Sequence, residues 1–178
     1  YHKVTGQVLT SAVEKMSKSL KNVVNPDAII HEYGADTLRL YEMYMGPLEK
    51  SKPWNTQDIV GVHRFLQRVW RLVIPPAPEG SPTPVVALNP LLGDARDNEL
   101  ERLLHKTIKK VSEDIERFAY NTAIAQMIVW VNEAGKAKVL ARDQVERLLL
   151  ILSPLAPHIC EELWQRLGHG TSIAYEAW

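Results

Sequence analysis

The sequence predicts an all-α protein in which a short irregular segment is followed by an antiparallel helical bundle. Three observations support this class. Apolar residues recur every three or four positions in several stretches, as in helices with one buried face. Capping side chains, prolines and glycines mark where these stretches begin and end. The links between the later stretches are short, which favours antiparallel packing of neighbouring helices.

Size and charge restrict the possible functions. The chain has 178 residues, 46% hydrophobic and 24% charged, as expected for one globular domain or one with a small appendage. Lys plus Arg and Asp plus Glu number 21 each, so bulk positive charge is excluded as a way to hold nucleic acid, and any such contact needs a local patch. The single cysteine, Cys160, excludes an internal disulfide and favours a reducing, cytoplasmic compartment. No apolar run approaches the ~20 residues of a membrane span, so we expect no membrane association.

Two helices are predicted soon after an irregular start at residues 1–24. Residues 25–27, Asn-Pro-Asp, combine a capping side chain, a proline at the first helical position and an acidic first turn. The helix that they begin is expected to end at Gly34, a usual residue at helix ends. Asp36 is predicted to cap the second helix, which Gly46 and the proline after it terminate.

A third helix is predicted to start at Asn55, whose side chain can cap it. Its apolar positions recur at helical spacing: Ile59, Val62, Leu66, Val69 and Val73. Residues 74–90 then hold six of the eleven prolines of the chain. This composition predicts a surface connection rather than a helix or a central strand.

The strongest helical signal follows, from about residue 97 onward. One apolar seam steps by four and three positions through Leu104, Ile108, Val111, Ile115 and Phe118. The pair at 121–122, Asn-Thr, predicts a break and a new cap, after which a helix continues to about Gly135. Asp143 is predicted to cap the next helix, and Pro157 to begin the last one. Together with the third helix, these elements are predicted to form the bundle.

Residues 15–19 read Lys-Met-Ser-Lys-Ser, or KMSKS, and form a candidate phosphate-binding loop. Ammonium groups three positions apart neutralise phosphate charge, and the hydroxyl groups between them donate hydrogen bonds. A solvated loop of lysines and serines is the alternative interpretation, and the pentapeptide taken alone favours it.

The sequence around this loop resembles class I aminoacyl-tRNA synthetases, in which KMSKS is the second signature of the class. The elements Tyr-Gly-Ala-Asp at 33–36 and Leu-Arg at 38–39 are shared by the leucyl, isoleucyl and valyl group. Residues 41–48 and 64–70 look most like bacterial leucyl-tRNA synthetase. Two later stretches resemble the anticodon-binding bundle of that family: residues 120–124 and 153–164.

The resemblance implies two parts and a reaction. Residues 1–46 would be the KMSKS loop and stem-contact segment of the catalytic core, and residues 47–178 the anticodon-binding bundle. The parent enzyme would activate leucine with ATP, accompanied by Mg²⁺, and transfer it to tRNA-Leu. Lys15 and Lys18 would be catalytic by stabilising the α-phosphate and the departing pyrophosphate. Met16, Ser17 and Ser19 would complete the ATP-binding loop, which we expect to be mobile without ATP.

The same resemblance implies that other parts of the enzyme are missing. The first class signature, the nucleotide-binding sheet, the editing domain and the C-terminal tRNA domain have no counterpart in these residues. The chain also lacks an initiator Met and stops abruptly, which indicates a piece of a longer protein. We therefore expect the chain alone to be inactive, and the parent to be a cytoplasmic monomer.

The best local basic patch is a row of arginines in the third helix. Arg64, Arg68 and Arg71, spaced by four and three, share one side of that helix, and Trp70 is their neighbour in sequence. Fixed cations suit sugar–phosphate contacts and aromatic rings suit base stacking, so all four residues are candidate tRNA contacts. A solvated face with a core tryptophan is the alternative. For a second basic stripe, from 102 to 117, the interspersed acids favour the solvated face.

Two further clusters have structural alternatives. Asp36 and Arg39 either brace the loop against the helices or serve as a helix cap and a surface arginine. His158 and Cys160 lie two positions apart, on different sides of a helix, and no second Cys/His cluster completes a zinc site, so no metal is expected.

Two other functional assignments remain open. One is an isoleucyl- or valyl-tRNA synthetase segment. The other is a non-catalytic helical module that binds RNA or protein.

Overall fold

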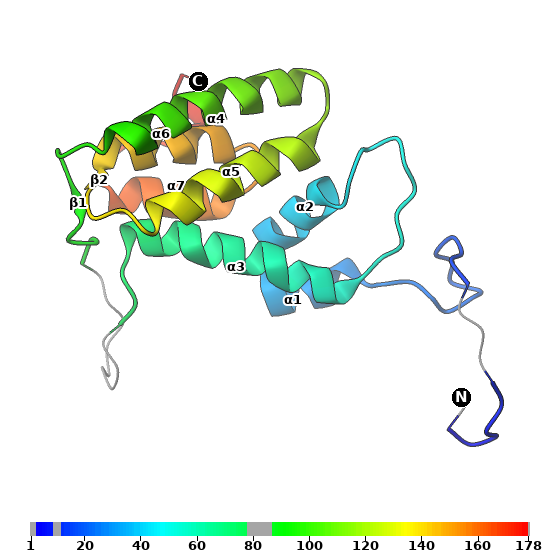
Figure 1. Cartoon of the computed structure of the whole chain (residues 1–178). Coiled ribbons are helices and arrows are strands. Elements are labelled where there is room, and N and C mark those ends of the chain that lie inside the picture. Colours follow the sequence, from blue (N-terminus) through cyan, green and yellow to red (C-terminus); the bar gives the residue numbers. More distant parts are fainter. Residues whose placement is uncertain (1–2, 9–11, 78–86, 178) are drawn as a thin grey trace.

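The computed structural model describes residues 3–8, 12–77 and 87–177 of the chain. Within these residues it contains seven α-helices, one 3-10 helix and two very short strands (Figure 1). The predicted all-α class is therefore confirmed. The helices are α1 (Pro26–Tyr33), α2 (Ala35–Tyr44), α3 (Thr56–Val73), α4 (Asn98–Glu116), α5 (Tyr120–Ala134), α6 (Arg142–Leu152) and α7 (Pro157–Arg166). The 3-10 helix η1 spans Ile173–Tyr175, and the strands are β1 (Leu92–Gly93) and β2 (Leu140–Ala141).

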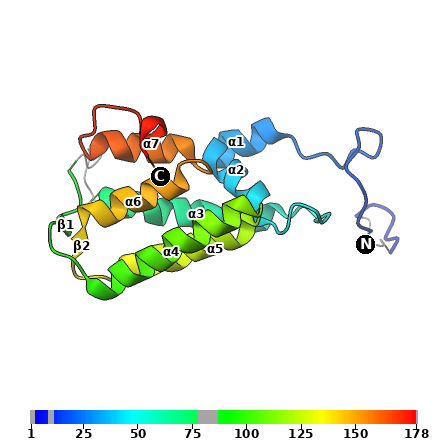
Figure 2. The ribbon, with the colours of Figure 1, turned by 90° about the horizontal axis from the view of Figure 1, so that it is seen from above.

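Helices α4 and α5 form an antiparallel hairpin that packs against α3, α6 and α2. Helix α7 lies beside α6 and α3, with η1 against it (Figures 1 and 2). The two strands pair in parallel, joining Leu92 to Leu140 where the connection after α3 meets the link between α5 and α6. Helices α1 and α2 cover the end of α3 that is remote from the two strands. The N-terminal segment extends away from the bundle at that end (Figure 2).

A single hydrophobic core runs through the bundle and includes α1 and α2. The side chains of Phe65, Leu104, Trp130 and Leu163 are fully buried, and the Trp130 indole N–H donates to the Leu100 carbonyl at 3.2 Å. The five apolar positions predicted for α3 are all buried. The same core contains these residues of α1 and α2: Ile29, Leu40 and Tyr41. The boundary proposed at residue 46 stays a prediction.

Two predicted helix starts are confirmed because their signals are local. The Asn25 side chain accepts from the Asp27 N–H at 3.0 Å, and the Asn55 side chain accepts from the Gln57 N–H at 3.0 Å. Gly34 ends α1 and starts α2 with φ of +87°, a conformation that side-chain-bearing residues avoid. The middle of the proline-rich connection, residues 78–86, lies outside the described residues.

Three predicted caps were wrong. The Asn-Thr pair at 121–122 lies inside the first turn of α5, which starts at Tyr120 and has no side-chain cap at its N-cap residue, Ala119. Helix α2 starts at Ala35 and has Gly34 as its N-cap, so Asp36 lies inside the first turn. Helix α6 starts at Arg142, so Asp143 also lies in a first turn, where its carboxylate pairs with Arg147 at 2.8 Å. In α2 and α6 the acid therefore bonds other groups than the free N–H groups at the start of its own helix.

The predicted end of α4 was wrong as well. Helix α4 ends at Glu116, and Phe118, expected in the apolar seam, is 64% exposed with φ of +56°. The Phe118 N–H donates to the Ile115 carbonyl at 3.1 Å, and the Ala119 N–H donates to the Asp114 carbonyl at 2.8 Å. This pair of bonds is the Schellman ending, in which the residue at Phe118 must adopt the left-handed conformation.

None of the helices in the described ranges is long and apolar enough to cross a bilayer.

Candidate functional site

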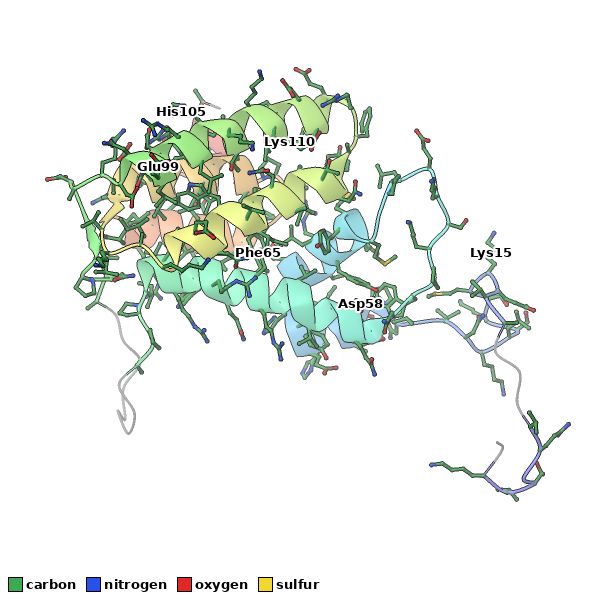
Figure 3. All side chains as sticks on the ribbon, in the orientation of Figure 1. Lys15, Asp58, Phe65, Glu99, His105 and Lys110 are labelled. Carbon is green, nitrogen blue, oxygen red and sulfur yellow. The ribbon has the colours of Figure 1, made fainter. Side chains whose placement is uncertain are left out.

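The KMSKS residues form one loop, which stands apart from the bundle (Figures 1 and 3). The Asn22 side chain bonds the backbone at the start of the loop twice. Its oxygen accepts from the Ser17 N–H at 2.7 Å, and its amide donates to the Lys15 carbonyl at 3.3 Å. The Ser17 hydroxyl accepts from the Leu20 N–H at 3.2 Å and lies 3.1 Å from the Ser19 hydroxyl. Sequence reasoning missed Asn22, although an Asn side chain that bonds nearby backbone is a common signal of a turn.

Both lysines of the loop are exposed and form no ion pair with the described part of the chain. Figure 3 shows Lys15 pointing outward, beyond the end of α3 that Asp58 marks. Met16 is 40% exposed and is not part of the hydrophobic core of the described residues. The loop thus presents two ammonium groups and two hydroxyl groups on a backbone that its own side chains hold in a turn.

Asp36 connects the segment after the loop to the start of α7. Its carboxylate accepts from the backbone N–H groups of Ile159 at 2.7 Å and His158 at 3.3 Å, and lies 2.8 Å from the His158 Nδ1. These N–H groups open helix α7, whose own N-cap residue, Ala156, has no capping side chain. Asp36 therefore supplies from α2 the cap that α7 lacks.

Arg39, one turn further along α2, binds the same corner. Its Nε donates to the Leu155 carbonyl at 3.3 Å and its Nη2 to the Pro154 carbonyl at 2.9 Å. Asp36 and Arg39 thus hold the turn between α6 and α7 through its amide and carbonyl groups. The interpretation of this pair as a brace agrees with this geometry, but the braced element is the bundle corner rather than the KMSKS loop.

The arginine row of α3 is unpaired. All arginines lie in the described ranges, and Arg64, Arg68 and Arg71 are those whose side chains form no hydrogen bond or ion pair with the described residues. Arg147, by contrast, binds Glu101 at 2.9 Å. Arg64 and Arg71 are exposed and Arg68 is half-buried. The row therefore presents uncompensated positive charge along one side of α3.

Trp70 is not part of that row in space. The guanidinium of Arg166, in α7, lies 5.2 Å from the Trp70 ring, at a distance typical of a cation–π contact. Trp70 lines a cavity of about 510 Å³ between α1, α3 and α7, together with Tyr33, His63 and His158. The structure therefore brings the three arginines together and places the tryptophan on another face of the helix.

The two residues considered as metal ligands lie in different surroundings, and the His158 Nδ1 is 2.8 Å from the Asp36 carboxylate. Cys160 is buried, and burial, with the nearby charge of Asp36, raises the pKa of its thiol well above its ordinary value. Hydrogen bonds from Ser172 and Gln165 lower the pKa of Glu161, which also accepts from the Ile173 N–H. Across the described residues no group of three or more His, Cys, Asp or Glu side chains is arranged to hold a metal ion.

Two family models match the chain. Residues 97–178 match the anticodon-binding domain of tRNA ligase, and residues 1–52 match tRNA synthetases class I (I, L, M and V). The first match covers α4 to η1, and the second covers the KMSKS loop with α1 and α2.

Characterised relatives and a solved structure agree with these models. The leucine–tRNA ligase of Chloroherpeton thalassium is 51% identical over 170 residues, which is 96% of this chain and 20% of that protein. The leucine–tRNA ligase of Cytophaga hutchinsonii is 53% identical over 175 residues, or 96% of this chain and 18% of that protein. A crystal structure of the Agrobacterium radiobacter K84 agnB2 LeuRS-tRNA-LeuAMS ternary complex superposes with a TM-score of 0.73 at 31% identity, covering 92% of this chain and 22% of that one. The chain thus spans about a fifth of the length of its relatives, and the resemblance noted in its sequence is confirmed.

Proposed function

Because this chain is homologous over nearly its whole length to one segment of the class I leucine–tRNA ligases, we propose that it serves as the KMSKS end of the catalytic core and the anticodon-binding bundle of such a ligase. The parent enzyme activates leucine with ATP and transfers it to tRNA-Leu. The observation that carries the proposal is the KMSKS loop leading directly into helices at 51% identity with leucine–tRNA ligases.

In the first step, a leucine carboxylate oxygen attacks the α-phosphorus of ATP while the bond to the bridging oxygen breaks and pyrophosphate leaves. Negative charge grows on the departing group, and ammonium groups of Lys15 and Lys18 neutralise it. Ser17 and Ser19 add hydroxyl donors, and Met16 shapes the backbone between them. The second step, attack by a ribose hydroxyl of the tRNA on the leucyl carbonyl, releases AMP and needs no further group from this loop.

Mg²⁺ enters this reaction as part of the ATP substrate, where it neutralises phosphate charge. The loop offers ammonium groups and neutral hydroxyls rather than the carboxylates that this ion prefers, so the residues present do not fit a protein-held Mg²⁺ site. We assign it no ligand in this chain.

For the bundle, we propose that Arg64, Arg68 and Arg71 meet the sugar–phosphate backbone of the tRNA. They form no ion pair with the described part of the chain, and this supports the proposal, because no carboxylate of that part has to be displaced. Trp70 faces the α7 side, so any stacking contact that it makes involves a separate part of the RNA. We further propose that the ligase is a cytoplasmic monomer.

The test is leucine-dependent ATP–pyrophosphate exchange by the longer ligase that contains this chain. Lys18→Ala should lower the exchange rate at least about a hundredfold with little change in the KM for leucine, because the lysine acts on charge that grows during reaction. Lys106→Ala, which removes an exposed lysine on α4, is the matched control and should leave the rate unchanged. Normal exchange by the Lys18 variant would contradict the proposal, and exchange with isoleucine or valine instead would reassign the substrate.

Residues 1–178 alone are expected to show no exchange. Leucine-dependent exchange by this chain would contradict the assignment of the remaining catalytic groups to other parts of the ligase.

A further inference from the structure

A cavity of about 460 Å³ lies between the C-terminal half of α3 and the end of α5. Arg68 and Arg71 line it from α3, and Asn132 and Lys136 line it from the end of α5 and the link that follows. Its apolar wall includes Leu72, Val131 and Leu140, and no carboxylate is among the described residues that line it. A cavity lined by three cations, with no acid among its described lining residues, selects for an anion.

The arginine side chains of this cavity have N–H donors that bond no described residue. Within the described ranges, Arg68 and Arg71 have no ion pair, and the Nε of Arg68 is buried without a hydrogen-bond acceptor. Buried donors are nearly always satisfied, so an unsatisfied one in a charged group needs an explanation. A ligand oxygen beside the guanidinium supplies the missing acceptor. Two guanidinium groups one turn apart suit a phosphate, which accepts several such bonds at once.

Of the other polar side chains that line the cavity, Asn89 bonds the surrounding backbone, whereas Asn132 can bond a ligand. Asn89 belongs to the wall, because its amide donates to the carbonyls of Arg71 and Leu72 and its oxygen accepts from the Leu91 N–H. The Asn132 side chain makes no hydrogen bond within the described ranges, so its amide remains available. Sequence reasoning could not group Asn132 with the arginines, because they come from different helices.

Two features oppose an anion, and neither outweighs the arginines. Glu133 lies next to the cavity, but Lys136 binds it at 2.8 Å in an exposed pair and offsets its charge. The C-terminal end of α5 contributes about half a negative charge by its helix dipole. The two unpaired arginines contribute two full positive charges, so the cavity keeps a positive potential.

We propose that this cavity binds a phosphate group of an RNA backbone, held by Arg68, Arg71 and Lys136 with Asn132 beside them. The cavity is larger than a phosphate needs, which leaves room for the attached sugar. It lies at the end of α3 remote from the KMSKS loop, and α3 is about 27 Å long at 1.5 Å per residue (Figures 1 and 3). A nucleic acid is long enough to reach both. The choice of RNA rests on the proposed function, whereas the choice of phosphate rests on the cavity.

The test is titration of a fluorescent tRNA-Leu transcript with residues 1–178 at several salt concentrations. Arg68→Gln should weaken binding about tenfold, and Lys136→Gln should weaken it about threefold. Each should reduce the slope of log affinity against log salt by about one, the value for one lost phosphate contact. Arg102→Gln is the matched control, since Arg102 is an exposed arginine on α4 outside the cavity, and it should leave the slope unchanged. Thermal unfolding of each variant checks that the fold is retained.

Three competitors, namely inorganic phosphate, polyglutamate and an unlabelled RNA, distinguish a phosphate site from general attraction of anions. Millimolar inorganic phosphate that competes with the transcript for the wild-type chain, but not for Arg68→Gln, supports a site for the phosphate group itself. Equal losses for Arg68→Gln and Arg102→Gln would overturn the proposal, and so would competition by polyglutamate as strong as that by an unlabelled RNA. The titration measures binding by the chain alone. A failure of the leucine-dependent exchange assay would therefore contradict the proposed ligase function but not the phosphate site.

Discussion

The Asp36 carboxylate caps helix α7 from a different helix, and its Oδ2 lies 2.7 Å from the Ile159 N–H. The two residues are 123 positions apart in the chain, and Asp36 also accepts from the N–H of His158, 122 positions away. Asp36 is 7% exposed, so its charge is satisfied almost entirely by α7. This contact and the Arg39 bonds attach α2, and hence the segment that carries the KMSKS loop, to the corner between α6 and α7.

Removing this cap should destabilise the chain. Asp36→Ala is expected to lower the free energy of unfolding by about 2 kcal/mol, the upper end for a lost helix cap, because half-buried N–H groups at the start of α7 lose their acceptor. Amide exchange at His158 and Ile159 should accelerate more than exchange in α5. Urea unfolding and hydrogen exchange measure both effects. Asp27→Ala, which removes an exposed acid from the first turn of α1, is the control and should cost much less.

Phe118 occupies a position that favours glycine. Its φ of +56° at the end of α4 costs a residue with a Cβ roughly 1 kcal/mol, and its exposed ring recovers little by burial. Phe118→Gly should therefore raise the free energy of unfolding by about 0.5–1 kcal/mol in urea denaturation. Phe118→Ala removes the same ring but keeps the Cβ, and should give no comparable gain. A loss of stability in the glycine variant would show that the ring contact with Tyr120 matters more than the backbone.

Asp114 should make stability depend on acid pH. Burial raises its pKa, but hydrogen bonds from Lys110 and Thr122 and the charges of Lys110 and Arg117 lower the pKa below its ordinary value. A lowered pKa in the folded state means that the stabilisation is present above the unfolded pKa of about 4 and is lost as the pH falls through the folded value. Unfolding free energies measured from pH 6 downward, in steps to about pH 2, should decline in that window. Asp114→Asn should reduce the decline, and an unchanged slope would contradict the assignment to Asp114.

Asn22 should matter to catalysis although it bears no charge. Its side chain holds the backbone of Ser17 and Lys15, so Asn22→Ala frees the loop that carries both lysines. In the longer ligase we expect a fall of about tenfold in the rate of ATP–pyrophosphate exchange, with an unchanged KM for leucine, because positioning affects the reacting state more than leucine binding. Val23→Ala, an exposed neighbour, is the control. Equal rates for the two variants would show that the loop needs no internal support.

Part of this site was predictable because its signals are local. The KMSKS residues lie within five positions, and their turn is closed by a residue only three positions further on. The separation of Trp70 from Arg68 was also within reach, since two residues in sequence are roughly 200° apart around a helix. Trp70 is close to the arginines in sequence, but the angle between successive residues of a helix already places it on another side of α3. The cavity that joins Arg68 to Lys136 was beyond any pattern, because it depends on how α3 and α5 pack.

By itself the sequence determined the helical class, the caps at Asn25 and Asn55 and the buried face of α3. Each of these depends on residues within a few positions of one another, and short-range hydrogen bonds and apolar periodicity encode them. Only the tertiary structure decided that Asp36 caps α7, that Phe118 lies outside the core, and that arginines without an ion pair among the described residues line a cavity whose described wall holds no acid. These outcomes depend on which distant groups meet once the core closes, and a carboxylate or guanidinium takes whichever partner the packing brings to it.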